Sequence, residues 1–211
     1  MRHYRKIATL IAVYLVLCVL FVTGCEQEKV YVPVTVNTLE VTEDGSLIGY
    51  IVEAFDKDYY DIQELDSMVR SEMDSYNEKK ANLAAGVGRV PIQVEKVMMA
   101  EDGSANAVVA LNFANAAVYR DYMGKDIFYG TVSQAVSSGY TLTGMLNSVK
   151  DGAVFGTEQI VKDGEKSVLI VEDTVSIRVN DKVQYLSPNA KLTEEGFVDG
   201  TSEEPKYIIT K

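Results

Sequence analysis

Histidine, cysteine and tryptophan are nearly missing from this chain, and their absence excludes several kinds of chemistry. The 211 residues include one histidine, two cysteines and no tryptophan. His3, Cys18 and Cys25 all lie near the N-terminus, so residues 26–211 contain neither histidine nor a thiol. That part of the chain cannot form a Ser-His-Asp or Cys-His catalytic centre. It also cannot form a zinc, copper or haem site with His or Cys ligands, or an internal disulfide bond.

A glycine-rich phosphate loop is lacking as well. The nearest candidate is Gly86-Val87-Gly88, which has Pro91 where a third glycine would stand and no Gly-Lys-Ser/Thr ending. It precedes an expected strand rather than a helix, contrary to a nucleotide-binding fingerprint. We interpret Gly86 as the residue that ends the preceding helix. No cofactor is expected, apart from the calcium ion considered below.

The N-terminus has the layout of a secretory signal. Three basic residues are followed by an apolar run from Ile7 to Val22 and then by Val22-Thr23-Gly24-Cys25. A positive region, an apolar region and small residues before a cut are the parts of a signal peptide. The alternative is an uncleaved transmembrane anchor, although the run is short of the roughly 20 residues that span a bilayer. Either interpretation places the rest of the chain outside the cytoplasm.

The four residues Val22-Thr23-Gly24-Cys25 resemble the lipobox of bacterial lipoproteins. The resemblance implies that residues 1–24 are a signal peptide and that Cys25 carries a diacyl group on its sulfur. Residues 25–30 would then be a short tether at an outward-facing membrane surface, and the lipid on Cys25 would be the contact with the membrane. The chain as a whole resembles small lipoproteins of Gram-positive gut bacteria, which implies an address but no activity.

The remaining chain is strongly acidic. The signal segment takes three of the 20 Lys and Arg residues and none of the 31 Asp and Glu residues, which leaves a net charge of −14. Such a surface argues against a nucleic-acid partner and against electrostatic binding to anionic lipid. An acidic surface favours cationic partners or divalent ions. The alternative is that the acids only solvate the exterior of the protein.

The pattern predicts an α+β fold: an antiparallel sheet with one long and one or two short helices on one face. Tyr31 to Val36, Leu39 to Thr42 and Leu47 to Phe55 read as strands, and Glu43-Asp44-Gly45-Ser46 reads as a hairpin turn. Asp61 and Glu64 form a capping box for a helix that ends at about Ala85. The apolar stripe of this helix is Ile62, Leu65, Val69, Met73 and Tyr76.

The same plan follows a second time. Ile92 to Ala100 and Asn106 to Phe113 read as strands around a second Glu-Asp-Gly-Ser turn, and a helix is expected from Asn115 to Met123. Two β-hairpin–helix units would be an internal duplication. Chance produces short turn sequences too, so both explanations stay open.

The last third predicts a β-rich part. A short helix is expected at 131–138, strands at Ser167 to Val171, Thr174 to Val179 and Lys182 to Leu186, and a loop over 187–205. Tyr207 to Thr210 is expected to add an edge strand. We divide the chain into an α+β region, 31–145, and a β-rich C-terminal part of the same domain, 146–211.

Acidic residues cluster before the long helix. Asp56, Asp58 and Asp61 offer hard oxygen ligands of the kind that Ca²⁺ accepts. The run lacks the glycine and the final glutamate of an EF-hand, and Asp61 already has a capping role. A solvated loop with an acidic bias at the helix start explains the run without a metal ion, and we favour this interpretation.

Tyrosines form a second group of candidates. Tyr119, Tyr122 and Tyr129 lie close together in the sequence and are predicted to contact a partner, because tyrosine buries area while keeping a polar tip. Packing between helix and sheet is the alternative. Tyr59-Tyr60 adds two tyrosines to the acidic loop.

These features predict a membrane-anchored extracytoplasmic lipoprotein that acts as a binding module, with an envelope protein as its partner. It is not expected to be an enzyme. Two alternatives come from other classes. A calcium-stabilised structural domain would use the acidic loop. A carboxylate-based hydrolase would need two opposed acids in a cleft, and with 31 acids some pair lies close by chance.

Overall fold

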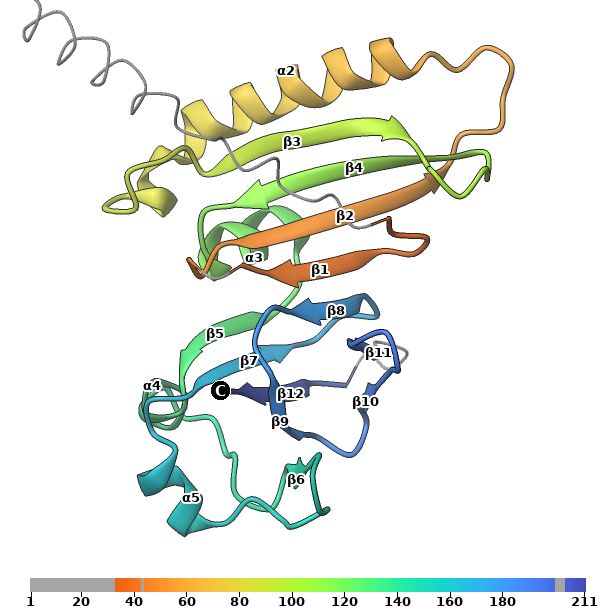
Figure 1. Ribbon diagram of the computed structural model, residues 1–211. Coiled ribbons are helices and arrows are strands. Elements are labelled where there is room, and N and C mark those ends of the chain that lie inside the picture. Colours follow the sequence, from red (N-terminus) through yellow and green to blue (C-terminus); the bar gives the residue numbers. More distant parts are fainter. Residues whose placement is uncertain (1–32, 43, 200–203) are drawn as a thin grey trace, which may run out of the picture. The chain divides into compact units, whose positions relative to one another are not determined.

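The computed structural model describes residues 33–42, 44–199 and 204–211, which belong to one compact unit (Figure 1). The predicted signal peptide, Cys25 and the tether lie outside these residues. The α+β fold class is confirmed, with helices and two β-sheets in the described part of the chain. No helix in this part combines the length and the apolar character needed to cross a membrane.

Sheet A has seven strands and is antiparallel except at one pair of neighbours. Strands β1 and β8 run parallel, although they lie far apart in the sequence. The strand order is β10 (Lys191–Leu192), β11 (Phe197–Asp199), β8 (Ser176–Val179), β1 (Thr38–Val41), β2 (Leu47–Ala54), β4 (Asn106–Phe113) and β3 (Ile92–Met99).

Two hairpins meet along their inner strands in this sheet. β1–β2 and β3–β4 are joined by β2 and β4, which pair over eight residues from Leu47↔Phe113 to Ala54↔Asn106. The two Glu-Asp-Gly-Ser turns need a positive φ, and their glycines supply it: φ is 78° at Gly45 and 79° at Gly103. This order is compatible with a duplication, but the helices that follow the hairpins differ greatly in length.

Helix α2 (Ile62–Lys80) lies along sheet A and continues into the 3₁₀ turn η1 (Ala81–Ala84). Asp61 caps its N-terminus by accepting the backbone N–H groups of Gln63 and Glu64. The reciprocal bond from the Glu64 side chain, which a capping box requires, is not formed among the described residues. The N-terminus is therefore held by half of the expected capping box, and at the other end the last turn before Ala85 is 3₁₀ rather than α-helical.

Asn77 on α2 protects the outer edge of sheet A. Its side-chain amide donates to the carbonyl of Ile92 at 2.7 Å and accepts from the N–H of Ile92 at 2.8 Å. The amide thereby occupies both outward backbone groups of Ile92, at the start of the edge strand β3. Open backbone groups on an edge strand are sites of unwanted pairing.

Helix α3 (Ala116–Met123) follows β4 and lies within one residue of the predicted range. Asn115 caps its first turn by accepting the N–H of Val118 at 3.0 Å. Gly124 ends it in the left-handed conformation with φ 66°. These two residues fix where the second helix starts and stops.

Sheet B has five strands and corrects two sequence-based expectations. β5 was not expected as a strand, and β12 lies at the centre of the sheet rather than at an edge. β8 and β9 follow each other closely in the sequence but belong to different sheets. The strand order is β5 (Ile127–Thr131), β7 (Ser167–Val171), β12 (Lys206–Thr210), β9 (Val183–Leu186) and β6 (Asn147–Ser148).

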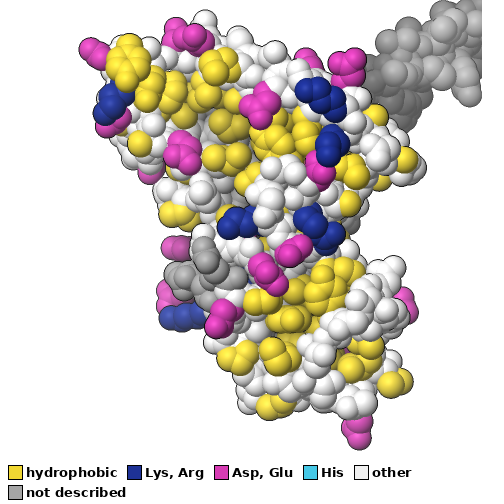
Figure 2. Space-filling view, turned by 180° about the vertical axis from the view of Figure 1, so that it is seen from behind, with side chains coloured by type: hydrophobic (Ala, Val, Ile, Leu, Met, Phe, Trp, Pro, Cys, Tyr) yellow, Lys and Arg dark blue, Asp and Glu magenta, His cyan; other side chains and the backbone are white. Residues whose placement is uncertain are grey.

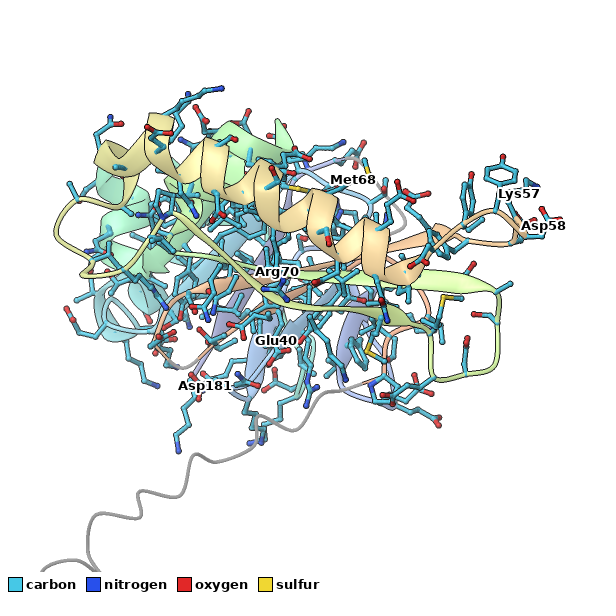
Figure 3. The ribbon with its side chains drawn as sticks, turned by 90° about the horizontal axis from the view of Figure 1, so that it is seen from above. Glu40, Lys57, Asp58, Met68, Arg70 and Asp181 are labelled. Carbon is cyan, nitrogen blue, oxygen red and sulfur yellow. The ribbon has the colours of Figure 1, made fainter. Side chains whose placement is uncertain are left out.

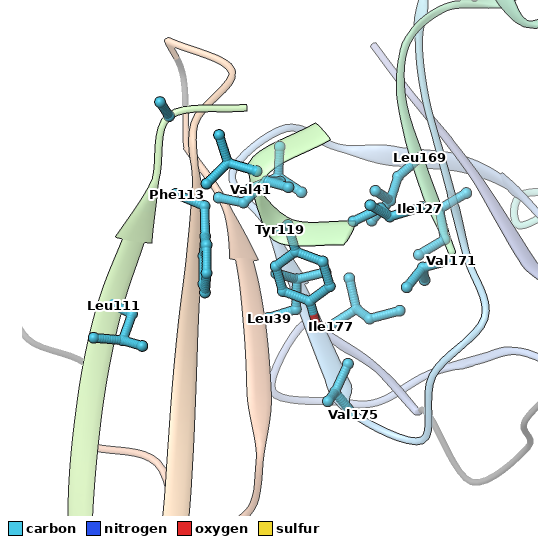
Figure 4. Close-up of a cluster of buried hydrophobic side chains, with 14 of the residues drawn as sticks. Leu39, Val41, Leu111, Phe113, Tyr119, Ile127, Leu169, Val171, Val175 and Ile177 are labelled. Carbon is cyan, nitrogen blue, oxygen red and sulfur yellow. The ribbon is translucent and has the colours of Figure 1, made fainter. Parts of the chain in front are cut away.

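One large hydrophobic core joins both sheets to α2 and α3. Tyr119 of α3 lies between Leu39 of sheet A and Ile127 of sheet B (Figure 4). A Cβ atom at Gly49 would lie 3.0 Å from the ring of Phe113, so glycine allows this ring to rest on the sheet. A second core covers the other face of sheet B beneath α4 (Val132–Ser137) and α5 (Thr157–Lys162).

Candidate interaction surface

Tyr119, one of the three tyrosines predicted to contact a partner, is buried in the core. Its hydroxyl donates to Asp173 Oδ2 at 3.2 Å. Burial, and then the nearby Asp173 carboxylate, raise the pKa of this tyrosine. Lys206, which is fully buried, donates to the backbone carbonyl of Asp173. Tyr119 therefore belongs to a buried polar network, which leaves it no surface for a partner.

Tyr122 lies half-buried between the two helices. Its hydroxyl donates to Glu72 Oε1 at 3.0 Å, and its ring packs edge-on against Tyr76. Burial, followed by the bond to Glu72, raises the pKa of Tyr122 to about 12. Asp121 accepts from the Tyr76 hydroxyl at 2.9 Å and from Lys80 Nζ at 2.8 Å. These contacts fasten α3 to the C-terminal half of α2.

Tyr129 also has an internal role. It is half-buried on β5, with its ring against the turn at Gly45. It lines a cavity of about 100 Å³ together with Asn180 and Asp181. This volume corresponds to a few water molecules, since each occupies about 30 Å³ in the liquid.

The three carboxylates proposed as calcium ligands all lie in the loop between β2 and α2, and two of them have protein partners. Asp56 pairs with Lys57 at 3.1 Å, and Asp61 caps α2. Among the described residues, no group of three or more His, Cys, Asp or Glu side chains is arranged to hold a metal ion. The loop is therefore better described by its aromatic residues.

An exposed aromatic chain follows β2 in this loop. Phe55 stacks on Tyr60 with 4.7 Å between ring centroids, and Tyr60 contacts Tyr59 edge-on at 4.9 Å. Tyr59 is 73% exposed and Tyr60 is 44% exposed. The stacking gives the loop an ordered apolar surface that faces solvent.

Two exposed methionines belong to the elements that lead away from this loop and end beside it in the sheet. Met68 in the N-terminal half of α2 is 63% exposed, and Met99 at the end of β3 is 38% exposed. Figure 3 shows Lys57 and Asp58 at the tip of the loop and Met68 on the flank of α2 opposite Arg70. We call Phe55, Tyr59, Tyr60, Met68 and Met99 the open corner.

A row of side chains across β2, β4 and β3, two residues along each strand from the row that contains Met99, is also incompletely covered. Ile51, Val109 and Val97 are in register on the face that α2 covers, yet all three are only half-buried. In Figure 2, hydrophobic side chains gather between acidic ones over the upper part of the molecule, which holds α2 and these strands. Exposed apolar patches of this kind are typical of interaction sites.

Acidic side chains surround the open corner. Bases are scarce among the described residues here: Lys57 pairs with Asp56, and Lys96 lies 3.8 Å from Glu101. Seven exposed acids lie at the end of β2, in the loop, in the first turn of α2 and in the β3–β4 turn. They are Glu53, Asp56, Asp58, Asp61, Glu64, Glu101 and Asp102.

The resolved carboxyl pKa shifts run opposite to those of a catalytic acid. In each case the largest cause is a hydrogen bond with a neighbouring side chain: Thr42 for Asp44, Ser104 for Asp102, Lys80 for Asp121 and Ser148 for Asp151. These contacts lower the pKa of all four carboxyl groups. A glycosidase-type general acid needs a raised pKa instead.

Sequence reasoning noticed Tyr59-Tyr60 but did not single out Phe55, Met68 or Met99. Met68 stands out of phase with the apolar stripe of α2, and this was the available signal. In comparisons with protein-family models, curated proteins and solved structures, nothing matches the chain.

Proposed function

We propose that the protein is a lipid-anchored, extracytoplasmic binding module that contacts a protein partner through the open corner. The observation that carries this proposal is the exposed Phe55–Tyr60–Tyr59 chain beside the half-covered end of the α2–sheet interface. The N-terminal Val22-Thr23-Gly24-Cys25 motif supports the anchor.

Physical chemistry favours this corner as a contact surface. Tyrosine and methionine are enriched at protein interfaces, and tyrosine often carries a large share of the binding energy. The rings of Phe55 and Tyr60 are already stacked, so a partner would not have to order them. Pre-ordered side chains lower the entropic cost of association.

Site-specific photo-crosslinking in cells tests the contact surface. A photoreactive amino acid at position 59 or 68 should give discrete protein adducts, whereas the same residue at position 161 or 154 should not. Val161 and Val154 are matched controls because they are 85% and 60% exposed and belong to the distant α5 region. Equal adducts from all four positions, or none from 59 and 68, would contradict the proposal.

The anchor has a separate test. Cys25→Ser should leave an unacylated, uncleaved precursor, detected by metabolic labelling with a fatty acid and by gel mobility. Processing at the same position in this variant would show that Cys25 is not the modified residue.

A further inference from the structure

We infer that the segment bound at the open corner is basic: a protein segment in which arginine or lysine side chains flank an apolar residue. This inference rests on the proposed function, because it names the chemistry of the partner for the same surface. Its basis is the charge around the aromatic chain: the end of β2, the loop, the first turn of α2 and the β3–β4 turn carry seven exposed acids and one described base, Lys57, while Arg70 and Lys96 nearby pair with Asp66 and Glu101.

Several of these acids lack an ion pair within the described part of the chain. Lys57 is engaged by Asp56 at 3.1 Å, which leaves Asp58 at the tip of the loop without a cation. Glu53 and Glu64, on either side of the loop, likewise form no described salt bridge. Carboxylates beside exposed tyrosine rings suit a guanidinium group, which pairs with the acid and stacks on the ring.

Charge also separates this partner from other occupants. Residues 26–211 carry a net charge of −14, so a second copy of the chain would bring more negative charge to an acidic surface. Nucleic acid and anionic lipid are disfavoured for the same reason. A basic protein segment satisfies both the apolar corner and its acidic rim.

Peptide selection with the full-length, detergent-solubilised protein tests the inference. A phage library of random dodecapeptides would be selected against the immobilised chain, and selected sequences would be compared with the unselected library. We expect enrichment of Arg and Lys over Asp and Glu around an aromatic or aliphatic residue. Binding should weaken as salt is raised, since exposed ion pairs are screened.

Charge-neutralising variants locate the effect. The double variant D56N/D58N should weaken binding of the selected peptides about tenfold, because it removes the Asp58 carboxylate, which forms no ion pair within the described residues, and leaves Lys57 as an unopposed positive charge that repels a basic peptide. The matched control E165Q/E194Q removes the same charge from exposed positions outside the loop and should change nothing. Asp61 is left intact because it caps α2.

The outcomes separate this inference from the proposed function. If the selected peptides are neutral or acidic and their binding is lost in Tyr59→Ser, the partner is not basic, but the open corner remains the binding site. Basic peptides that bind equally to wild type, D56N/D58N and Y59S would contradict the corner itself. Equal losses in D56N/D58N and E165Q/E194Q would mean that only the overall charge matters, and would also overturn the inference.

Discussion

The two ends of the α2–sheet A interface are built from similar side chains but differ sharply in burial. At the C-terminal half of α2, Met73, Ile92 and Phe113 are 2%, 1% and 0% exposed. We call these three residues the closed end. At the N-terminal half, methionines and aromatic rings of the open corner face solvent. The same helix and the same sheet face therefore support both a sealed core and an accessible apolar surface.

The difference follows from how many elements cover the sheet. A helix is about 10 Å wide, whereas strands lie about 4.8 Å apart, so one helix covers roughly two strands. At the closed end α3 lies beside α2, joined to it by the Tyr122–Glu72 and Lys80–Asp121 bonds. At the open corner no second helix of the described chain is present. Within the described chain, the sheet face next to the N-terminal half of α2 is therefore left without a second covering helix.

A matched pair of phenylalanines should show the largest contrast. Phe113→Ala should lower the free energy of unfolding by about 3–5 kcal/mol, because it empties a fully buried site. Phe55→Ala at the open corner should cost about 1 kcal/mol or less, since its ring is half-exposed. Urea unfolding followed by circular dichroism measures both. Similar losses for the two variants would contradict the distinction between the ends.

Two methionines on one helix give a second, smaller contrast. Met73→Ala should cost about 2–5 kcal/mol, whereas Met68→Ala should change stability by about 0.5 kcal/mol or less. Helix propensity changes almost equally in both variants, so the difference reports burial alone. If Met68→Ala were as destabilising as Met73→Ala, Met68 would be packed and the open corner would not exist as described.

Substitutions of Asp61 and Asp58 should affect stability differently, because Asp61 caps α2 whereas Asp58 is solvated. Asp61→Ala should cost about 0.5–2 kcal/mol, because it removes the acceptor for the N–H groups of Gln63 and Glu64. Asp61→Asn should restore most of this loss, and Asp58→Ala should have almost no effect. Thermal melting with and without a calcium chelator completes the series. A loss in Asp58→Ala that appears only when calcium is present would instead support a metal site in the loop.

Alkaline pH should slightly lower the free energy of unfolding, because the Tyr122 hydroxyl that joins α3 to α2 loses its proton. The folded-state pKa of Tyr122 is raised to about 12, so its stabilisation is complete below the ordinary tyrosine pKa near 10 and is lost as pH rises toward 12. Urea midpoints measured from pH 8 upward should therefore fall above pH 10. Tyr122→Phe should reduce this dependence. An unchanged slope in Y122F would mean that other tyrosines carry the whole effect.

Local patterns in the sequence predicted helices and strands well where turn and capping residues mark their ends. Asn106 to Phe113 was predicted with its observed bounds, because a run of mostly apolar residues follows an Asp-Gly turn that fixes a hairpin. Asn115 and Gly124 marked the limits of α3 in the same local way. These signals act over a few residues and do not depend on distant partners.

Long-range pairing could not be predicted in this way. The parallel contact between β1 and β8 joins segments more than a hundred residues apart, and no local pattern encodes it. β12 was predicted as an edge strand, whereas it lies at the centre of sheet B, and Lys206 at its start is buried and hydrogen-bonded. The tyrosine cluster misled for a related reason: Tyr119 fills a core, and only the relative position of the two sheets reveals it.

The place of β12 has a consequence for how the molecule is made. Residues 206–210 form the central strand of sheet B, with β7 on one side and β9 on the other. Ribosomes release a chain in order, so sheet B cannot close until residue 210 has emerged, and sheet A also waits for β8. Until then β7 and β9 lack the strand that lies between them, whereas the hairpins β1–β2 and β3–β4 need no later residue. For the export that we propose, this order means that the segments crossing the membrane first belong to a sheet B that has not yet closed.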